Sequence, residues 1–304
     1  MTAAGASGPV HCSAVIPTRN GAATLPALLA ALERQKSRGL DEIVAIDSGS
    51  RDATRDLLGD AGATILDLGG SPFGHGRARN RAAAAARGEV LLFLTQDVEP
   101  IGDEWLTAML AALADRRVAG VFGRQVPRGA SPEEAFLARV NYAGRPRCIT
   151  AADVARSFGP GATLFSSAFG AVRRVVWETL PFPDIVMSED QAWALAALRA
   201  GYEIRYEPRA AVHHGHRFGF ARVFRRNFDS GSSLQALGLA SGSWRAGPDH
   251  LLRELRWIGS QHGARAVPHA IAYEVVRMLG FQAGRLERRL PRALAQLLGE
   301  APRP

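Results

Sequence analysis

Short apolar runs alternate with segments of helical periodicity along the first 125 residues. The apolar runs predict buried strands, at residues 13–17, 43–46, 64–68, 89–94 and 118–122. Leucines and alanines at helical spacing predict the helices between them, at residues 24–39, 50–58, 77–87 and 103–114. Ser50 and Asp103 are the expected N-caps of two of these helices, and Gly39 is the expected end of the first.

Strands and helices that alternate at this spacing predict an α/β fold, with a mostly parallel sheet flanked by helices on both faces. Ligands of such sheets bind in the crevice beyond the carboxyl ends of the strands. Asp47 and Asp97 each lie at the carboxyl end of a predicted strand. We therefore expect both carboxylates to face one crevice.

The alternation weakens in the second half of the chain. Loops and a short helix are expected over residues 128–160, and extended chain over 163–173 precedes a helix that contains Trp177. A further helix is expected from Ser188 to Gly201, and a last strand follows at 203–206. Beyond it the sequence predicts helices rich in arginine.

The composition is that of a globular protein. Of the 304 residues 47% are hydrophobic and 22% charged, which excludes a disordered chain. The two cysteines, Cys12 and Cys148, indicate neither a disulfide framework nor a zinc site and fit a reducing cytosol. No signal peptide or membrane-spanning segment is predicted, since apolar runs such as Val90–Leu94 are far shorter than the roughly 20 residues that a spanning helix needs. We expect a cytoplasmic protein whose membrane contacts are peripheral.

The net charge is +8, and Lys36 is the only lysine among the 37 basic residues. A solvated basic surface, an anionic substrate and an anionic membrane surface all explain this charge. Nucleic acid is not expected, because no helix-turn-helix, zinc finger or RNA-binding strand is present.

Two aspartates at strand ends are candidate ligand residues. Asp97, in Thr95-Gln96-Asp97, is either a turn or capping residue or a ligand of Mg²⁺ or Mn²⁺, which prefer oxygen ligands. Asp47, followed by Ser48-Gly49-Ser50, either shapes a turn or accepts hydrogen bonds from the base or ribose of a nucleotide.

Three further motifs are candidates for chemistry. Residues 73–80 open a helix with Gly74-x-Gly76, and Arg77 and Arg79 there are either surface arginines or phosphate ligands. Ser188 and Gln191 form a possible capping box, whose helix dipole would keep Asp190 ionised as a general base must be. Residues 213–216, His-His-Gly-His, are either a polar loop or a source of metal ligands.

Taken in order, these motifs resemble glycosyltransferase family 2 over roughly residues 13–235. Residues 15–20, Val-Ile-Pro-Thr-Arg-Asn, are similar to the first strand and loop of that family. Thr95-Gln96-Asp97 takes the place of its Asp-x-Asp motif, with threonine in place of the first aspartate, and Glu189-Asp190 matches its Glu-Asp motif. The resemblance implies a GT-A (Rossmann-like) fold with a helical C-terminal extension, and single displacement with inversion.

The resemblance also implies roles for individual residues. Asp190 is expected to be the catalytic base, with Glu189 beside it, and Asp97, His214 and His216 are expected to hold Mn²⁺ or Mg²⁺. The residues expected at the donor nucleotide are Pro17, Thr18, Asn20, Asp47, Ser48, Gly76, Arg79, Asn80, Thr95 and Gln96.

Several details are similar to the bacterial rhamnosyltransferase branch of the family. These are residues 73–76 with Arg79-Asn80, residues 95–97, 181–183, 189–191, and His214-Gly215-His216 leading to Phe228-Asp229-x-Gly231. The expected donor is a nucleotide-diphosphate sugar, with rhamnose favoured, and the expected acceptor is a sugar or lipid-linked hydroxyl. A nucleotidyltransferase and a non-catalytic nucleotide-sugar-binding protein are the alternatives.

We expect three parts in the chain. Residues 10–125 would bind the nucleotide sugar, and residues 126–232 would complete the same domain with the acceptor and catalytic half. Residues 233–304 would form the helical extension. Its residues 244–304 would either cap the core or lie on an anionic membrane surface. The sequence gives no indication of the oligomeric state.

Overall fold

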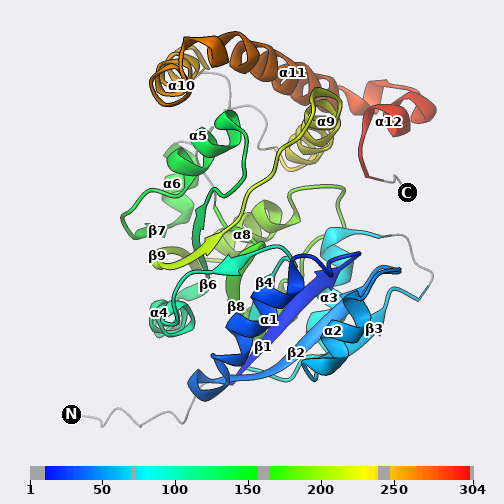
Figure 1. The fold of residues 1–304 in the computed structure, drawn as a ribbon, viewed down its shortest axis with the longest axis vertical. Helices are drawn as coiled ribbons and strands as arrows, with labels where there is room; N and C mark the ends of the chain where they lie inside the picture. Colours follow the sequence, from blue (N-terminus) through cyan, green and yellow to red (C-terminus); the bar gives the residue numbers. More distant parts are fainter. Residues whose placement is uncertain (1–10, 70–72, 157–163, 239–246, 302–304) are drawn as a thin grey trace.

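The computed structural model describes residues 11–69, 73–156, 164–238 and 247–301. Helices and strands alternate through most of the chain, and helices alone follow the last strand (Figure 1). The strands are β1 (Cys12–Thr18), β2 (Leu40–Asp47), β3 (Thr64–Asp67), β4 (Val90–Leu94), β5 (Glu99–Pro100), β6 (Val118–Val126), β7 (Arg147–Ile149), β8 (Phe169–Arg173) and β9 (Glu203–His213).

The helices cover both faces of the sheet and then form a separate group at one end of the molecule (Figure 1). They are α1 (Leu25–Glu33), α2 (Thr54–Asp60), α3 (His75–Ala85), α4 (Trp105–Ala112), α5 (Pro132–Asn141), α6 (Ala151–Arg156), α7 (Arg174–Thr179), α8 (Glu189–Arg199), α9 (Phe220–Ala236), α10 (Gly247–His262), α11 (Val267–Arg285) and α12 (Arg292–Leu298). The predicted α/β architecture with a helical C-terminal region is confirmed.

Within the described residues the strands form one mixed sheet in the order β3-β2-β1-β4-β8-β6-β9-β5, with β7 also paired to β9. Strands β3, β2, β1 and β4 are parallel, as expected. Strand β8 lies antiparallel between β4 and β6. It falls in the segment 163–173 that was predicted to be extended, of which Thr163 lies outside the described residues. One sheet therefore joins strands from residues 10–125 with strands from residues 126–232.

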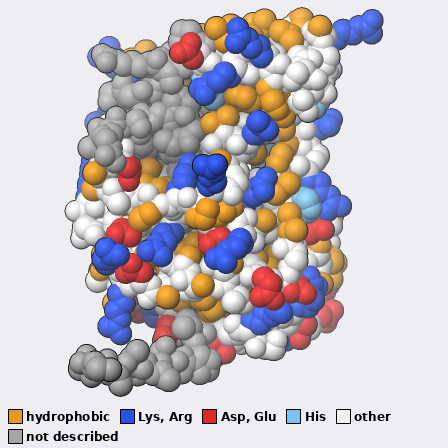
Figure 2. All heavy atoms as spheres, turned by 90° about the vertical axis from the view of Figure 1, so that its left-hand side faces the viewer, with side chains coloured by type: hydrophobic (Ala, Val, Ile, Leu, Met, Phe, Trp, Pro, Cys, Tyr) orange, Lys and Arg blue, Asp and Glu red, His pale blue; other side chains and the backbone are white. Residues whose placement is uncertain are grey.

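Beyond the sheet, the upper end of the molecule is formed by helices that pack on one another (Figure 1). Side chains at Gly231 of α9 and at Gly280 and Gly284 of α11 would collide with main-chain atoms of the facing helix, so these glycines let α9 and α11 pack closely. Trp257 of α10 packs on Phe136 of α5 with ring centroids 5.7 Å apart. At this upper end, hydrophobic and arginine side chains share the surface in Figure 2.

The helical extension is predicted over residues 233–304, and residues 239–246 and 302–304 of it lie outside the described residues. In the part of the chain that the structure describes, none of the helices combines the length and apolar character needed to cross a bilayer.

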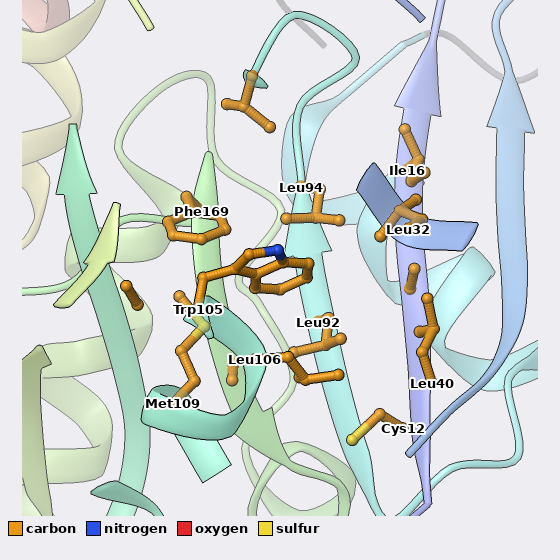
Figure 3. Packing of buried hydrophobic residues seen from close by; sticks show 14 of the residues in the cluster. Cys12, Ile16, Leu32, Leu40, Leu92, Leu94, Trp105, Leu106, Met109 and Phe169 are labelled. Carbon is orange, nitrogen blue, oxygen red and sulfur yellow. The ribbon is translucent and has the colours of Figure 1, made fainter. Parts of the chain in front are cut away.

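The two faces of the sheet have separate cores. Side chains alternate along a strand, so Ala14 and Ile16 of β1 pack with α1, α2 and α4, whereas Val15 packs with α3 and α8. Trp105 of α4 is fully buried and lies 5.5 Å from the ring of Phe169 of β8, beside the leucines of β4 (Figure 3). This packing fixes the antiparallel strand β8 in the middle of the sheet.

The predicted N-caps Ser50 and Asp103 are wrong, since α2 and α4 begin a few residues later. The Ser50 hydroxyl donates to Asp47 Oδ2 at 2.5 Å, and Asp103 accepts from Arg34 Nε at 2.7 Å. Both side chains are used in other contacts, which override the local preference for a cap. The first helix, expected to run to Gly39, ends at Glu33, and Gly39 instead ends the short 3₁₀ helix Lys36–Arg38 in a left-handed conformation.

Candidate active site

Strands β2 and β3 lie on one side of β1 and strand β4 lies on the other, so the order of strands in the sheet reverses at β1. In a doubly wound sheet the ligand crevice lies at this point, beyond the carboxyl ends of the strands. Gln96 joins the loops that follow β1 and β4: the Arg19 N–H donates to Gln96 Oε1 at 2.9 Å, and Gln96 Nε2 donates to the Arg19 carbonyl at 3.0 Å. A side chain at Gly21 would collide with Gln96, so glycine there admits this link.

Asp47 is buried at the end of β2 and is surrounded by donors. Its carboxylate accepts from the Ser50 N–H at 2.9 Å, the Gly49 N–H at 3.2 Å and the Thr18 hydroxyl at 3.1 Å. Burial raises the pKa of Asp47, but the hydrogen bonds from Ser50, Thr18 and Gly49 outweigh it and lower the pKa overall. Asp47 therefore fixes this loop as an ionised residue, and its direct contact with a nucleotide stays a prediction.

Other residues that were predicted to bind the donor lie at the ends of β1 and β2, at the same edge of the sheet as Asp47. Pro17 and Thr18 end β1, and the Ser48 N–H donates to the Thr18 carbonyl at 2.9 Å. The Asn20 N–H donates to the Ser50 hydroxyl at 2.8 Å, and Asn20 has a left-handed backbone with φ 47°. Hydrogen bonds thus fix the main chain of both loops at the crevice.

Asp97, His214 and His216 lie together, although the sequence separates the aspartate from the histidines by more than a hundred residues. His214 Nε2 lies 3.6 Å from Asp97 Oδ1, and His216 Nε2 lies 3.8 Å from Asp97 Oδ2. One ligand atom from each residue falls within 4.8 Å of the others. Asp97 follows β4 and the histidines follow β9, so the sheet brings the three side chains together.

Burial and neighbouring charges in this cluster favour the protonation states in which the side chains of Asp97 and His216 bind a metal ion. Burial raises the pKa of Asp97, but His214, then Thr95 and His216, lower it more, so the carboxylate is ionised. Burial, and after it the neighbouring His214, lowers the pKa of His216 to about 4, so its imidazole is neutral. A carboxylate and neutral imidazoles are the forms that bind a metal ion.

His214 is oriented from behind by Gln125 of β6. Its Nδ1–H donates to Gln125 Oε1, with 2.8 Å between the two atoms, and Nε2 is left to face Asp97. The Gln125 side chain in turn donates from Nε2 to the Ser166 hydroxyl at 2.8 Å. Gln125 was not predicted as a site residue, because it lies three residues beyond the apolar run 118–122 and its burial follows only from the extension of β6 to Val126.

Asp190 lies in the first turn of α8 and is positioned from the loop before β8. Its Oδ2 accepts from the Ser167 N–H at 3.1 Å, and its Oδ1 accepts from the Gln191 N–H at 2.8 Å. Burial, followed by the charge of Glu189, raises the pKa of Asp190 to about 6. At this pKa Asp190 is mostly ionised at neutral pH, and burial has moved the pKa toward neutrality, a range suited to a general base.

The predicted capping box of α8 is absent. Ser188 precedes the helix in a left-handed conformation, with φ 65°, and makes no capping bond. Gln191 accepts from the Leu164 N–H at 3.0 Å and donates to the Phe165 carbonyl. Its side chain fastens the loop that carries Ser167 and is therefore unavailable to cap the helix.

Glu189 and Arg79 form a buried ion pair across α8 and α3. Arg79 Nη1 donates to Glu189 Oε1 at 2.7 Å, and the two side chains are only 4% and 6% exposed. Arg77, further out on α3, pairs with Asp184. Contact of Arg79 with donor phosphate stays a prediction, because in this structure its guanidinium faces a carboxylate.

Gly76 and Asn80 of α3 shape the loop that follows α7. A side chain at Gly76 would collide with the Pro183 carbonyl, so glycine lets the loop lie against the helix. Asn80 Nδ2 donates to the Phe182 carbonyl at 2.7 Å, and its Oδ1 accepts from the Trp177 indole at 2.9 Å. Both residues thus have packing roles here, and their predicted contact with the donor stays a prediction.

Hydrogen bonds and close polar contacts connect the three candidate aspartates. Asp47 contacts Ser50, Ser50 accepts from Asn20, and the adjacent Arg19 is joined to Gln96. Beyond Gln96 the path runs from Asp97 to His214, Gln125 and Ser166. It ends at Ser167, next in sequence, which donates to Asp190. The three carboxylates are therefore linked through neighbouring residues, and the expectation that they face one shared crevice stays a prediction.

A sheet whose strand order reverses at β1, a cluster of Asp97, His214 and His216 after its strands, and a carboxyl group whose pKa is raised toward neutrality are the features expected of a GT-A glycosyltransferase. The chain belongs to glycosyltransferase family 2: the family model described as glycosyl transferase family 2 matches residues 13–180. The predicted identification of the family and of the enzyme class is thereby confirmed.

Two curated relatives cover most of the chain. The O-antigen chain rhamnosyltransferase RfbN of Salmonella typhimurium is 32% identical over 222 residues, which are 71% of this chain and 70% of the relative. The O-antigen chain rhamnosyltransferase WbaN of Salmonella anatum is 33% identical over the same shares of both chains. The resemblance to rhamnosyltransferases is confirmed by these relatives.

Solved structures share the fold. The mannosyltransferase PcManGT from Pyrobaculum calidifontis, in complex with GDP-Man and Mn²⁺, has a TM-score of 0.61 at 17% identity and covers 94% of this chain and 89% of its own. Mannosyl-3-phosphoglycerate synthase from Rubrobacter xylanophilus has a TM-score of 0.55 at 20% identity, over 75% of each chain. At these identities the likeness establishes the GT-A fold.

Proposed function

We propose that this glycosyltransferase moves rhamnose from a nucleoside-diphosphate donor to an acceptor hydroxyl, with a divalent cation and with inversion at the anomeric carbon. The observation that carries the proposal is the cluster of Asp97, His214 and His216 beside the crevice, connected through Gln125 and Ser166 to the loop that holds Asp190. A cation, a diphosphate and a proton acceptor are the three requirements of this chemistry.

The residues of the cluster fit a divalent cation. Metal–ligand bonds of about 2.1 Å place neighbouring ligand atoms about 3 to 3.5 Å apart, and the contacts of 3.6 and 3.8 Å in this structure are close to that spacing. Two imidazoles with one carboxylate suit Mn²⁺ better than Mg²⁺, which prefers oxygen ligands. We therefore favour Mn²⁺, held by Asp97, His214 and His216.

The cation would supply positive charge where the leaving diphosphate becomes more negative. Two unit charges about 4 Å apart interact by roughly 4 kcal/mol at an effective dielectric of 20. The chain holds the donor side of the crevice through Gln96, which ties the loops after β1 and β4, and through Asp47, which fixes the loop after β2. We propose that both residues position the nucleotide, so that departure of the diphosphate needs little rearrangement of the site.

Asp190 would accept the proton of the acceptor hydroxyl during attack. Its pKa of about 6 leaves it ionised at neutral pH yet basic enough to take a proton. A positioned base typically contributes about 10² to 10⁴ in rate. One base and one attacking hydroxyl give a single displacement, and a single displacement inverts the anomeric centre.

The sugar and the acceptor follow from the relatives. RfbN and WbaN are named as O-antigen chain rhamnosyltransferases, which supports rhamnose as the donor sugar. We propose thymidine diphosphate as its carrier. We propose a growing sugar chain on a lipid carrier as the acceptor, which would place the enzyme at the cytoplasmic face of the cell membrane. Residues 10–125 would hold the donor, and residues 126–232 would supply the acceptor side.

A donor screen tests the proposal. Thermal shift and calorimetry with thymidine, uridine and guanosine diphosphate sugars, with and without Mn²⁺, should single out the thymidine diphosphate sugar and require the metal. The released nucleotide and the anomeric configuration of the product, read by NMR, complete the test. Metal-independent binding, or a product that retains the donor configuration, would refute it.

A further inference from the structure

Exposed large hydrophobic side chains are concentrated in the C-terminal helices. Of the eleven in the described residues, nine lie between Phe220 and Leu297. Scattered single residues of this kind are ordinary, whereas a contiguous group marks a contact surface. The group lies at the upper end of the molecule, where Figure 2 shows hydrophobic side chains beside arginines.

Helix α11 carries the centre of this group. Its inner face packs on α9 through Gly280 and Gly284. Its outer face, here called the α11 face, consists of Ile271, Val275, Met278 and Leu279, which are between 37 and 53% exposed. Their spacing of i, i+4, i+7 and i+8 places them in one stripe. Ala272, next to Ile271, and Gln282, one turn beyond Met278, are uncharged as well.

Arginines surround the α11 face. Arg265, Arg288, Arg289 and Arg292 are exposed, and no ion pair joins them to a carboxylate within the described residues. Most acidic residues of these helices are otherwise engaged: Glu274 pairs with Arg277, Glu300 pairs with Arg222, Glu287 accepts from the Ser232 hydroxyl, and Glu254 is fully buried. Asp249 is exposed in the first turn of α10, on a different helix from the α11 face. An uncharged apolar stripe between unpaired arginines is complementary to a surface that is apolar within and anionic outside.

We propose that the α11 face docks on an anionic lipid bilayer, with the helix lying in the plane of the membrane surface. The arginines at both ends of α11 would contact lipid headgroups while Ile271, Val275 and Leu279 enter the acyl boundary. A second copy of this chain is the less fitting occupant, because a symmetric pair would bring the same arginines together. None of the described helices can span a bilayer, so the contact is superficial.

The proposal adds a membrane-binding surface to the proposed function. It rests on that function in one respect: a lipid-carried acceptor would explain why the enzyme binds a membrane. The α11 face is fixed to the candidate site through α9. Helix α9 starts four residues after His216, and its Asp229 accepts from the Glu300 and Ala301 N–H groups at 2.9 and 3.0 Å. A bilayer under α11 would therefore hold the metal cluster in a set orientation to the membrane.

Vesicle flotation of the full-length chain tests the proposal. The wild type should float with phosphatidylcholine vesicles that contain phosphatidylglycerol, and much less with phosphatidylcholine alone. The double variant Val275→Gln/Leu279→Gln should lose roughly tenfold or more in partitioning, and Arg288→Gln/Arg289→Gln should lose roughly tenfold on anionic vesicles only. Val175→Gln, an exposed valine on α7, is the matched control and should float like the wild type.

The outcomes separate the occupants. Wild-type protein that fails to float with anionic vesicles, or a Val275→Gln/Leu279→Gln variant that floats as well as wild type, would overturn the proposal. A dimer in light scattering that this variant converts to a monomer, without vesicle binding, would assign the face to a second copy. Donor binding with Mn²⁺, measured by calorimetry in solution, should be unchanged in every variant. If the wild type itself did not bind the donor, that result would count against the proposed function. Flotation with vesicles would still test the α11 face.

Discussion

His214 Nδ1 lies 2.8 Å from Gln125 Oε1, and this contact turns the opposite edge of the imidazole toward Asp97. A ligand histidine is held in one tautomer by such a partner, whose loss typically lowers metal affinity about 10- to 100-fold. Strand β6 thus positions a side chain of the proposed metal cluster without supplying a ligand itself.

Replacement of Gln125 should weaken Mn²⁺-dependent donor binding. We expect Gln125→Met to raise the Kd for donor in the presence of Mn²⁺ about 10- to 100-fold, as measured by calorimetry. Gln35→Met is the matched control, since Gln35 is also fully buried but lies near the end of α1, away from the site. Equal donor affinity in Gln125→Met and wild type would exclude this role.

Asp190→Asn should lower turnover by about 10² to 10⁴ while donor binding survives. In the wild type the rate should fall as pH drops through about 6, because protonation removes the base. The exposed Asp184, paired with Arg77, gives the control Asp184→Asn. A product assay over pH 5 to 8 checks both points, and turnover in Asp190→Asn that matches the wild type would end the assignment.

Arg79→Met should destabilise the fold, because it leaves the buried Glu189 carboxylate unpaired. The expected loss is about 3 to 5 kcal/mol in the free energy of unfolding, measured by urea denaturation. Adding Glu189→Gln should restore part of it. Arg77→Met, which breaks an exposed pair with Asp184, should cost less than about 1 kcal/mol. Similar losses in both single variants would contradict the importance of burial.

Glu254 should make stability depend on pH. It is fully buried, and burial, followed by the charge of Glu274, raises its pKa to about 8. Between the unfolded pKa near 4.5 and this value the folded state retains a proton that the unfolded state releases. Stability is therefore greatest at the acid end of this window and falls as pH rises toward 8, by up to about 1.4 kcal/mol per pH unit.

Thermal unfolding of the metal-free protein at pH 6, 7 and 8 measures this effect. The Tm should fall across the series in the wild type and fall less in Glu254→Gln, which carries no charge at any pH. Glu33→Gln, on the exposed surface beside Lys36, should follow the wild type. A Glu254→Gln variant with the wild-type slope would assign the pH dependence to other groups.

The sequence predicted the elements of the nucleotide half because its strands are short apolar runs that end in polar residues. From the ends of those runs it follows that Asp47 and Asp97 lie at one edge of the sheet, and the structure joins both to the loop after β1. The cluster of histidines near Asp97 was found for the same reason: they follow the last strand.

Contacts between distant segments were not predictable from local pattern. The antiparallel pairing of β8 between β4 and β6 depends on packing around Trp105 and Phe169, which no window of sequence contains. Ser188 and Gln191 satisfy the capping pattern, yet Gln191 bonds to the main chain of residues 164 and 165. The pKa of Asp190 depends on burial and on this same loop, neither of which can be inferred from its position in the first turn of a helix.

The continuous sheet limits how this enzyme can open and close. Strand β4, which precedes Asp97, and strand β9, which precedes His214, belong to the same hydrogen-bonded layer through β8 and β6. A hinge between the two halves would have to break main-chain hydrogen bonds of that layer. We therefore expect motion during turnover to be confined to the connecting loops, so that turnover responds to changes in loop length far more than to changes near residue 126.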